Sequence, residues 1–422
     1  MDTLVPNMGY CCWDCVLTLL DDARNQREIN PLRTAILKSH AKCVQLLLAD
    51  ERINRNQDVN GNGETPLFTA TIYANHDCVQ LLLADARTDV NQATTDSGTT
   101  PLYIAARLDR SECVQLLLAD PRTDVNQART VDGKTPLYIA ARQGFRNCVQ
   151  LLLADARTDV NQATTDGGVT PLYIAACLGR NECVQLLLAD PRTDVNQART
   201  VDGTTPLCAA ISIEHTNCVQ SLLANARTDV NRVRTDFGLT PLCIAANLGH
   251  RDCVQLLLAD VRTAVNQTGY AGDSALLVAA LNGHSEIVEL LLMDDIPSLI
   301  DHFSTWRGLV ISSLLCNAAF SSHLPVFLWK FIFSFLRPRT NVNQAIVTEG
   351  LSAWGVSLGL VRGSSALWLA SQQGHTACVE HLLESRDTDV FQPDAAGRTP
   401  LQMAQEGGHD ACVALLERSH KF

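Results

Sequence analysis

The stretch TPLYIAARQGFRNCVQLLLA (Thr135–Ala154) decides the fold. It opens with Thr135 and Pro136, a typical helix start, because a threonine hydroxyl at the N-cap accepts an orphan backbone N–H and proline has none to lose. A second apolar segment, Cys148–Leu153, follows. Its apolar side chains cover an arc of about 200° on a helical wheel. The stretch therefore predicts two short helices joined by a turn.

This pattern recurs every 35 residues. Neither helix reaches the ~12 to 15 residues that an isolated helix needs, so each unit must be stabilised by its neighbours. Weaker copies start at Asn30, Ser274, Ser365 and Thr399, which gives a stack of at least ten units. The regular copies of Thr-Pro-Leu and Cys-Val-Gln begin at Thr65, Thr100, Thr135, Thr170, Thr205 and Thr240, and at Cys43, Cys78, Cys113, Cys148, Cys183, Cys218 and Cys253.

The segments between units have a pattern of their own. Asp-Val-Asn is followed by polar residues and a tip such as Asp132-Gly133 or Asp202-Gly203. Glycine supplies the positive φ that a tight turn requires, so we expect a finger shaped like a short β-hairpin. Helix, turn, helix and finger then form the repeating unit.

The unit TTDGGVTPLYIAACLGRNECVQLLLADPRTDVNQ (Thr164–Gln197) resembles an ankyrin repeat, whose pattern carries T-P-L-H-x-A with a period near 33. The resemblance extends through the chain from about Cys15. It implies an all-α solenoid of about 10 to 11 stacked units with short β-hairpin fingers. The His of the family pattern is missing, which leaves open what replaces its hydrogen bonds. Its position is taken by Phe68, Tyr103, Tyr138, Tyr173, Cys208 and Cys243.

The register predicts four regions along the chain. They are an N-terminal cap or half repeat (1–30), regular repeats (31–293), a degenerate aromatic-rich repeat with insertions (294–363) and C-terminal repeats (364–422).

The third region allows more than one interpretation. Residues 338–344 repeat residues 191–197 with one change, which favours a degenerate repeat with a four-residue insertion. The apolar segment 309–336 could instead anchor the chain in a membrane, since ~20 apolar residues suffice to span a bilayer. A gene-model artefact is the third alternative.

The charge and cysteine content limit the classes of partner. The chain has 33 Lys and Arg against 45 Asp and Glu, a net charge of -12. This weighs against nucleic acid as the partner, because phosphate binding depends on an excess of Lys and Arg.

The start MDTLVPNMGYCCWDC shows no cationic leader and no long apolar stretch, so we expect no secretory signal. We therefore expect the 16 cysteines in a reducing compartment, the cytoplasm or the nucleus.

The ladder of cysteines, with histidines three residues before several of its members, invites a metal or redox interpretation. Equivalent positions on stacked helices lie ~8 to 10 Å apart, which is too far for a disulfide or a shared zinc ion. We expect a buried structural ladder, no metal and no cofactor.

Two short motifs suggest enzymes but lack the necessary context. Gly133-Lys134-Thr135 has neither the earlier glycine nor the strand of a P-loop. The segment 355–359 matches the nucleophile elbow of hydrolases around Ser357, without the parallel sheet that such an elbow requires. The chain is predicted not to be an enzyme, and an enzyme built on the inserted segment is the remaining alternative.

Two units, 101–135 and 171–205, differ at only four of 35 positions, at the end of the first helix, the following turn and the finger tip. The resemblance implies that these places line the concave groove through which ankyrin repeats bind partner proteins. Several are basic, so we expect an acidic peptide or domain as partner of a scaffold or adaptor; drift of unconstrained turn positions is the alternative. The candidate positions are Thr99, Arg107, Leu108, Lys134, Arg142, Gln143, Val169, Leu178, Ser212, Ile213, Leu239, Asn247 and Leu248.

The Asp-Val-Asn asparagines are candidates for modification. The resemblance implies asparaginyl hydroxylation, whereas an asparagine that hydrogen-bonds its own turn is the simpler interpretation. The positions are Asn91, Asn126, Asn161, Asn196 and Asn231.

Overall fold

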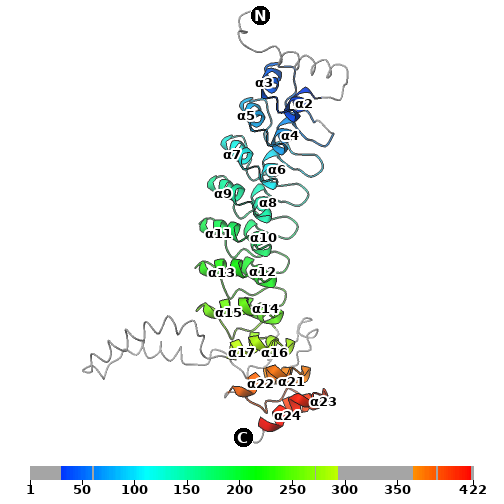
Figure 1. The fold of residues 1–422 in the computed structure, drawn as a ribbon, viewed down its shortest axis with the longest axis vertical. Helices are drawn as coiled ribbons and strands as arrows, with labels where there is room; N and C mark the ends of the chain where they lie inside the picture. The colour runs from blue at the N-terminus through cyan, green and yellow to red at the C-terminus, as the bar shows by residue number, and fades with distance from the viewer. Residues whose placement is uncertain (1–29, 59–60, 271, 293–364, 386–387, 420–422) are drawn as a thin grey trace, which may run out of the picture. The chain divides into compact units, whose positions relative to one another are not determined.

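The computed structural model describes residues 30–58, 61–270, 272–292, 365–385 and 388–419. These residues form paired helices, and no strand occurs among them. The predicted all-α class is therefore confirmed. The chain divides into two units, 1–201 and 202–422, and within each unit the helix pairs lie as successive layers (Figure 1).

The helices come in pairs. The first helix of each pair is α2, α4, α6, α8, α10, α12, α14, α16, α21 or α23, and the second is the helix that follows it. The first unit holds α2 (Pro31–Leu37), α3 (Ala41–Ala49), α4 (Pro66–Ile72), α5 (His76–Ala84), α6 (Pro101–Arg107), α7 (Ser111–Ala119), α8 (Pro136–Gln143), α9 (Arg146–Ala154), α10 (Pro171–Cys177) and α11 (Asn181–Ala189). The second unit holds α12 (Pro206–Ser212), α13 (Thr216–Ala224), α14 (Pro241–Leu248), α15 (Arg251–Ala259), α16 (Ala275–Asn282), α17 (Ser285–Leu292), α21 (Ala366–Gln373), α22 (Thr376–Glu384), α23 (Pro400–Glu406) and α24 (Asp410–Ser419).

The first helices begin as the sequence predicts. Thr135 Oγ1 accepts a hydrogen bond of 3.1 Å from the backbone N–H of Tyr138, with proline at the first helical position. The weaker copies use the same device: Ser274 and Ser365 cap α16 and α21 through their hydroxyls, and Asn30 caps α2 through its amide oxygen. The N-cap is thus kept where the Thr-Pro-Leu sequence is not.

The second helices bury their cysteines. In α9, Cys148, Val149 and Leu152 are fully buried, while Leu151 and Leu153 are partly exposed. The wide apolar arc is therefore covered completely at its centre and partly at its flanks. Burial raises the pKa of the Cys183 thiol to about 11 and that of Cys148 to about 12, which keeps both thiols protonated at neutral pH.

Two matched substitutions test this packing. We expect Cys183→Ser to lower the free energy of unfolding by about 1 to 3 kcal/mol, because a hydroxyl replaces a buried apolar group. Cys148→Ser should cost less, since Cys148 Sγ already lies 3.4 Å from Asp109 Oδ1, which can accept a hydroxyl hydrogen bond. Urea denaturation measures both. Equal losses, or none, would contradict this account of the ladder.

The fingers are tight turns. Arg129 N donates to Lys134 O over 3.0 Å and closes a finger whose tip holds Gly133 at φ +69°. The predicted β-hairpin shape is reduced to this closing bond, because the next pairing of each finger is sideways: Thr165 N donates to Asp132 O over 3.2 Å. A Cβ on Gly133 would lie 2.7 Å from Thr165 N. The glycine thus provides both the turn and the close approach of the next finger.

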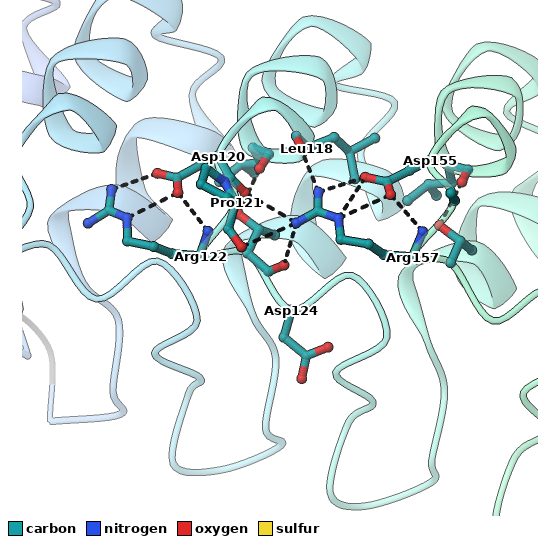
Figure 2. A network of polar contacts seen from close by, with 12 residues as sticks. Leu118, Asp120, Pro121, Arg122, Asp124, Asp155 and Arg157 are labelled. Atoms are coloured by element: carbon teal, nitrogen blue, oxygen red, sulfur yellow. Dashed lines mark hydrogen bonds and ion pairs between the residues drawn. The ribbon is translucent and has the colours of Figure 1, made fainter.

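An arginine that follows the second helix in many of the described repeats joins its repeat to the one before, as Arg157 shows (Figure 2). Arg157 Nη2 lies 2.6 Å from Asp155 Oδ2 and donates over 2.7 Å to Leu118 O, near the end of α7. Its Nη1 donates over 3.2 Å to Thr123 O. The guanidinium therefore satisfies carbonyls that the end of a helix leaves without a partner, and its charge opposes the negative end of the helix dipole. We call this Asp-x-Arg contact the clamp.

The clamp recurs through both units. Arg87, Arg122 and Arg192 reach Leu48 O, Leu83 O and Leu153 O in the first unit, and Arg262 reaches Leu223 O in the second. Asn225 takes the place of the aspartate in one copy and accepts from Arg227 N over 2.9 Å. Hydrogen bonds to the clamp arginine hold the pKa of Asp155 below its usual range.

The clamp makes the free energy of unfolding depend on pH, because it needs an ionised aspartate. We expect Asp155→Asn, which copies the asparagine found at position 225, to lower the free energy of unfolding by about 1 to 2 kcal/mol at pH 7, because a charge-assisted contact at a partly exposed site is lost. A lowered folded pKa contributes stability above the unfolded value of about 3.9 and loses it as the pH falls through the folded value. The gap between parent and variant should therefore close below about pH 4.

Urea denaturation between pH 7 and pH 2 measures that gap. Asp166→Asn, at an exposed finger tip, is the matched control and should leave stability unchanged. A gap that is constant across this range would show that the carboxylate charge does not stabilise the array.

The repeats on either side of residues 293–364 are direct neighbours. α21 packs on α16, and α22 packs on α17. His375 Nε2 donates to Leu281 O over 2.9 Å, which matches the bond of 3.0 Å between His409 Nε2 and Gln372 O at the next junction. This junction is therefore an ordinary repeat interface. The regions predicted at 294–363 and, apart from Asn30, at 1–30 lie outside the described residues.

A replacement tests whether this interface is self-sufficient. We expect a chain in which residues 294–364 are exchanged for the regular connector 155–169 to keep the melting temperature of the parent, because both faces of the junction stay intact. A lower melting temperature would show that the array needs the exchanged residues.

Candidate functional site

Each first helix ends at an exposed row of turn residues. In the first unit this turn row comprises residues 37–40, 72–75, 107–110, 142–145 and 177–180. Its apolar members are unusually open: Tyr73 is 56% exposed, Leu108 36% and Leu178 38%. Tyr73, Leu108 and Leu178 are all the C-cap residues of their helices, where the chain turns away from the core. Apolar side chains at the same position of three layers form a surface that a partner could cover.

The turn row of the first unit is basic. Asp109 is its one acid, and its cations are Lys38, Arg107, Arg110, Arg142 and Arg180. Arg107 and Arg142 are exposed, and no carboxylate of the described residues pairs with either. In a chain of net charge -12, this is a local reversal of sign.

The corresponding turns of the second unit differ in charge. They are residues 212–215, 247–250, 281–284, 372–375 and 406–409, which hold Glu214 and Glu406 but no lysine or arginine. Ile213 and Leu248 are exposed there, at 56% and 44%. Both units thus expose apolar side chains at the same turn position, but the charged residues around that position are mainly basic in the first unit and acidic in the second.

The last residue of several turns hydrogen-bonds the preceding turn. Arg180 Nε donates over 3.2 Å to Arg142 O of the preceding repeat, and His284 Nε2 does the same to Asn247 O at the same distance. The histidines His250 and His375 occupy helix N-cap positions in the inter-helix turn, as the sequence predicted.

On the finger side, basic residues cover the aromatic rings that replace the family histidine. Arg129 lies over Tyr103 and Arg199 over Tyr173, each 5.6 Å from the ring centroid. Lys134 Nζ is 5.9 Å from the Tyr138 ring centroid. At the three positions where a tyrosine replaces the family histidine, the ring therefore makes a cation–π contact.

A comparison with known protein families identifies the repeats. A family model of ankyrin repeats in three copies matches residues 7–94, 51–129, 86–164, 112–199, 156–233, 188–268, 217–300 and 339–421. The chain is an ankyrin-repeat protein. Its ankyrin array is similar to the crystal structure of the ankyrin repeat domain of Bcl-3, a member of the IκB family, with 24% identity, a TM-score of 0.48 and coverage of 52% of this chain and 95% of that one. The search of curated proteins found no match.

The thirteen predicted binding positions of the ankyrin array fall into two groups. Arg107, Leu108, Arg142, Leu178, Ile213 and Leu248 are exposed, and Gln143, Ser212 and Asn247 are half-buried, all at the turns after first helices. The finger positions are covered: Thr99 and Leu239 are buried, Val169 is half-buried, and Lys134 Nζ lies 2.9 Å from Asp132 Oδ2.

The Asp-Val-Asn asparagines form a second ladder between ankyrin repeats. Asn126 Nδ2 donates over 2.7 Å to Arg157 O, and its Oδ1 accepts over 2.7 Å from Asp159 N. Asn91, Asn161 and Asn231 bond the following repeat in the same two directions. The amide therefore bonds the next repeat rather than its own turn. These residues and Asn196 stay candidates for hydroxylation.

The other candidate sites of the sequence were a metal site, a membrane span and two enzyme-like motifs. Within the part of the chain that the structure describes, no group of His, Cys, Asp and Glu is placed to hold a metal ion, and no helix is long and apolar enough to cross a membrane. Gly133 and Lys134 form a finger tip. The apolar segment 309–336 and Ser357 lie outside the described residues.

Several members of the turn row were not predicted. Lys38, Tyr73, Arg110 and Arg180 occupy the same turns as predicted residues in other repeats. The prediction started from positions that differ between residues 101–135 and 171–205, so it missed Arg110 and Arg180, which are identical there, and Lys38 and Tyr73, which lie in other repeats. Reading every repeat at a fixed offset from its N-cap would have found them.

Proposed function

We propose that this ankyrin array is a protein-binding scaffold or adaptor without catalysis, and that partners dock on the turn rows. Ankyrin repeats are a module for protein–protein interaction, and the observation that carries the proposal is the exposure of Tyr73, Leu108 and Leu178 at the same position of three repeats of the first unit. Covering such side chains is favourable by about 25 cal/mol for each Å² of apolar surface.

The residues proposed to contact partners are narrower than the sequence alone suggested. Thr99 and Leu239 are buried, and Lys134 is paired with Asp132 within its own finger. We therefore assign binding to the turn positions, with Arg107, Leu108, Arg142 and Leu178 in the first unit and Ile213 and Leu248 in the second. Cys148 and Cys183 are buried free thiols, which suits a reducing compartment such as the cytoplasm or nucleus.

The test uses binders selected without bias. A displayed library of random peptides is selected on the full chain, and the affinities of the selected peptides are measured by fluorescence anisotropy. We expect Leu108→Ser with Leu178→Ser to weaken binding about tenfold, because a partner that covers the exposed third of each leucine gains roughly 0.5 to 1 kcal/mol from it.

Val261→Ser is the matched control. Val261 is 75% exposed but lies in the connector after α15, outside the turn rows. Its substitution should leave binding unchanged. Selected peptides that bind the double leucine variant as tightly as the parent would refute docking on the turn rows.

A further inference from the structure

The cations of the first unit differ in whether they are already paired. Arg122 and Arg157 are held by aspartates at 2.6 Å, and Lys134 by Asp132 at 2.9 Å. Arg107 and Arg142, in contrast, end in solvent at successive turns and have no acidic partner among the described residues. Their charge is therefore available to a ligand.

Apolar surface lies beside these two charges. Leu108 follows Arg107 directly, and Tyr73 and Leu178 hold the same position in other layers of the first unit. At the layer of Arg142 this position is taken by the polar Gln143. A ligand that satisfies the row must therefore offer carboxylates and apolar side chains together.

The spacing of the layers sets the spacing in the ligand. Packed helices lie ~8 to 10 Å apart, and an extended chain in the polyproline II conformation advances ~3.1 Å for each residue with three residues per turn, so that every third side chain lies on one face. One repeat thus corresponds to about three residues of an extended segment. Apolar residues facing Tyr73, Leu108 and Leu178 then fall at positions i, i+3 and i+9, with a polar residue at i+6 opposite Gln143.

We propose that the turn row of the first unit binds an extended acidic segment of a partner protein, with apolar side chains spaced in multiples of three residues and carboxylates facing Arg107 and Arg142. The inference rests on the proposed function and narrows its partner. A nucleic acid would also bring negative charge, but it offers no aliphatic groups to cover the exposed side chains of Leu108 and Leu178.

The probes are four fluorescent ligands offered to the full chain. The first is a 13-residue peptide with leucine at positions 1, 4 and 10 and Glu or Asp at most others. The second has lysine in place of every acid, and the third has serine in place of every leucine. The fourth is a single-stranded oligouridine. We expect the first to bind at least about tenfold more tightly than the others, with an affinity that falls as salt rises.

Charge reversal supplies the second arm. Arg107→Glu with Arg142→Glu should weaken the acidic peptide at least about tenfold and favour the lysine peptide instead. The matched control, Lys42→Glu with Arg232→Glu, makes the same change of net charge at exposed sites outside the turn row and should leave the order unchanged.

The outcomes separate the two proposals. Binding of the lysine peptide or the oligouridine as tightly as the acidic peptide, or insensitivity to charge reversal, overturns the acidic partner. If the binding of library peptides still depends on Leu108 and Leu178, the proposed protein-binding function stands even though the acidic partner does not. If no peptide depends on those leucines, both proposals fail.

Discussion

The array depends on the hydrogen bonds that an arginine after a second helix donates to backbone carbonyls of the preceding repeat. A helix of nine residues such as α9 leaves its last carbonyls without partners and is too short to be stable alone. Arg157 and its counterparts donate to such carbonyls from the next repeat, while an aspartate two residues earlier orients the guanidinium. The most demanding polar groups of each repeat are thus satisfied only when its neighbour is in place. Stability in such an array is a property of junctions rather than of single repeats.

The sequence was most informative where local chemistry acts alone. Thr135 and Pro136 predicted the helix start, and the spacing of Cys148 and Val149 predicted the buried face, because caps and helical periodicity need no knowledge of neighbours. The finger was predicted less well, since Thr165 bonds the finger before it and leaves one closing bond where a hairpin was expected.

Contacts between repeats could not be read from single units. The Asp-x-Arg spacing was visible at Asp155 and Arg157, but its meaning depends on Leu118, which lies 39 residues before the arginine. The pairing of Arg129 with Tyr103 is hidden for the same reason. Both signals exist as columns in the aligned repeats, so the repeat number of a residue matters less than its offset from the N-cap. The same reasoning narrows the site, because burial of Thr99 and pairing of Lys134 depend on neighbouring side chains.

The near identity of residues 101–135 and 171–205 has a consequence for how such an array can change over time. Because successive junctions are closed by the same kinds of arginine, asparagine and finger bonds, a repeat gained or lost by unequal exchange between similar stretches leaves each surviving interface complete. The length of the array can therefore vary in steps of one layer with little effect on folding. Each step would move one part of the turn row relative to another by about 8 to 10 Å, so that lineages can alter the spacing of their binding positions without inventing a new contact.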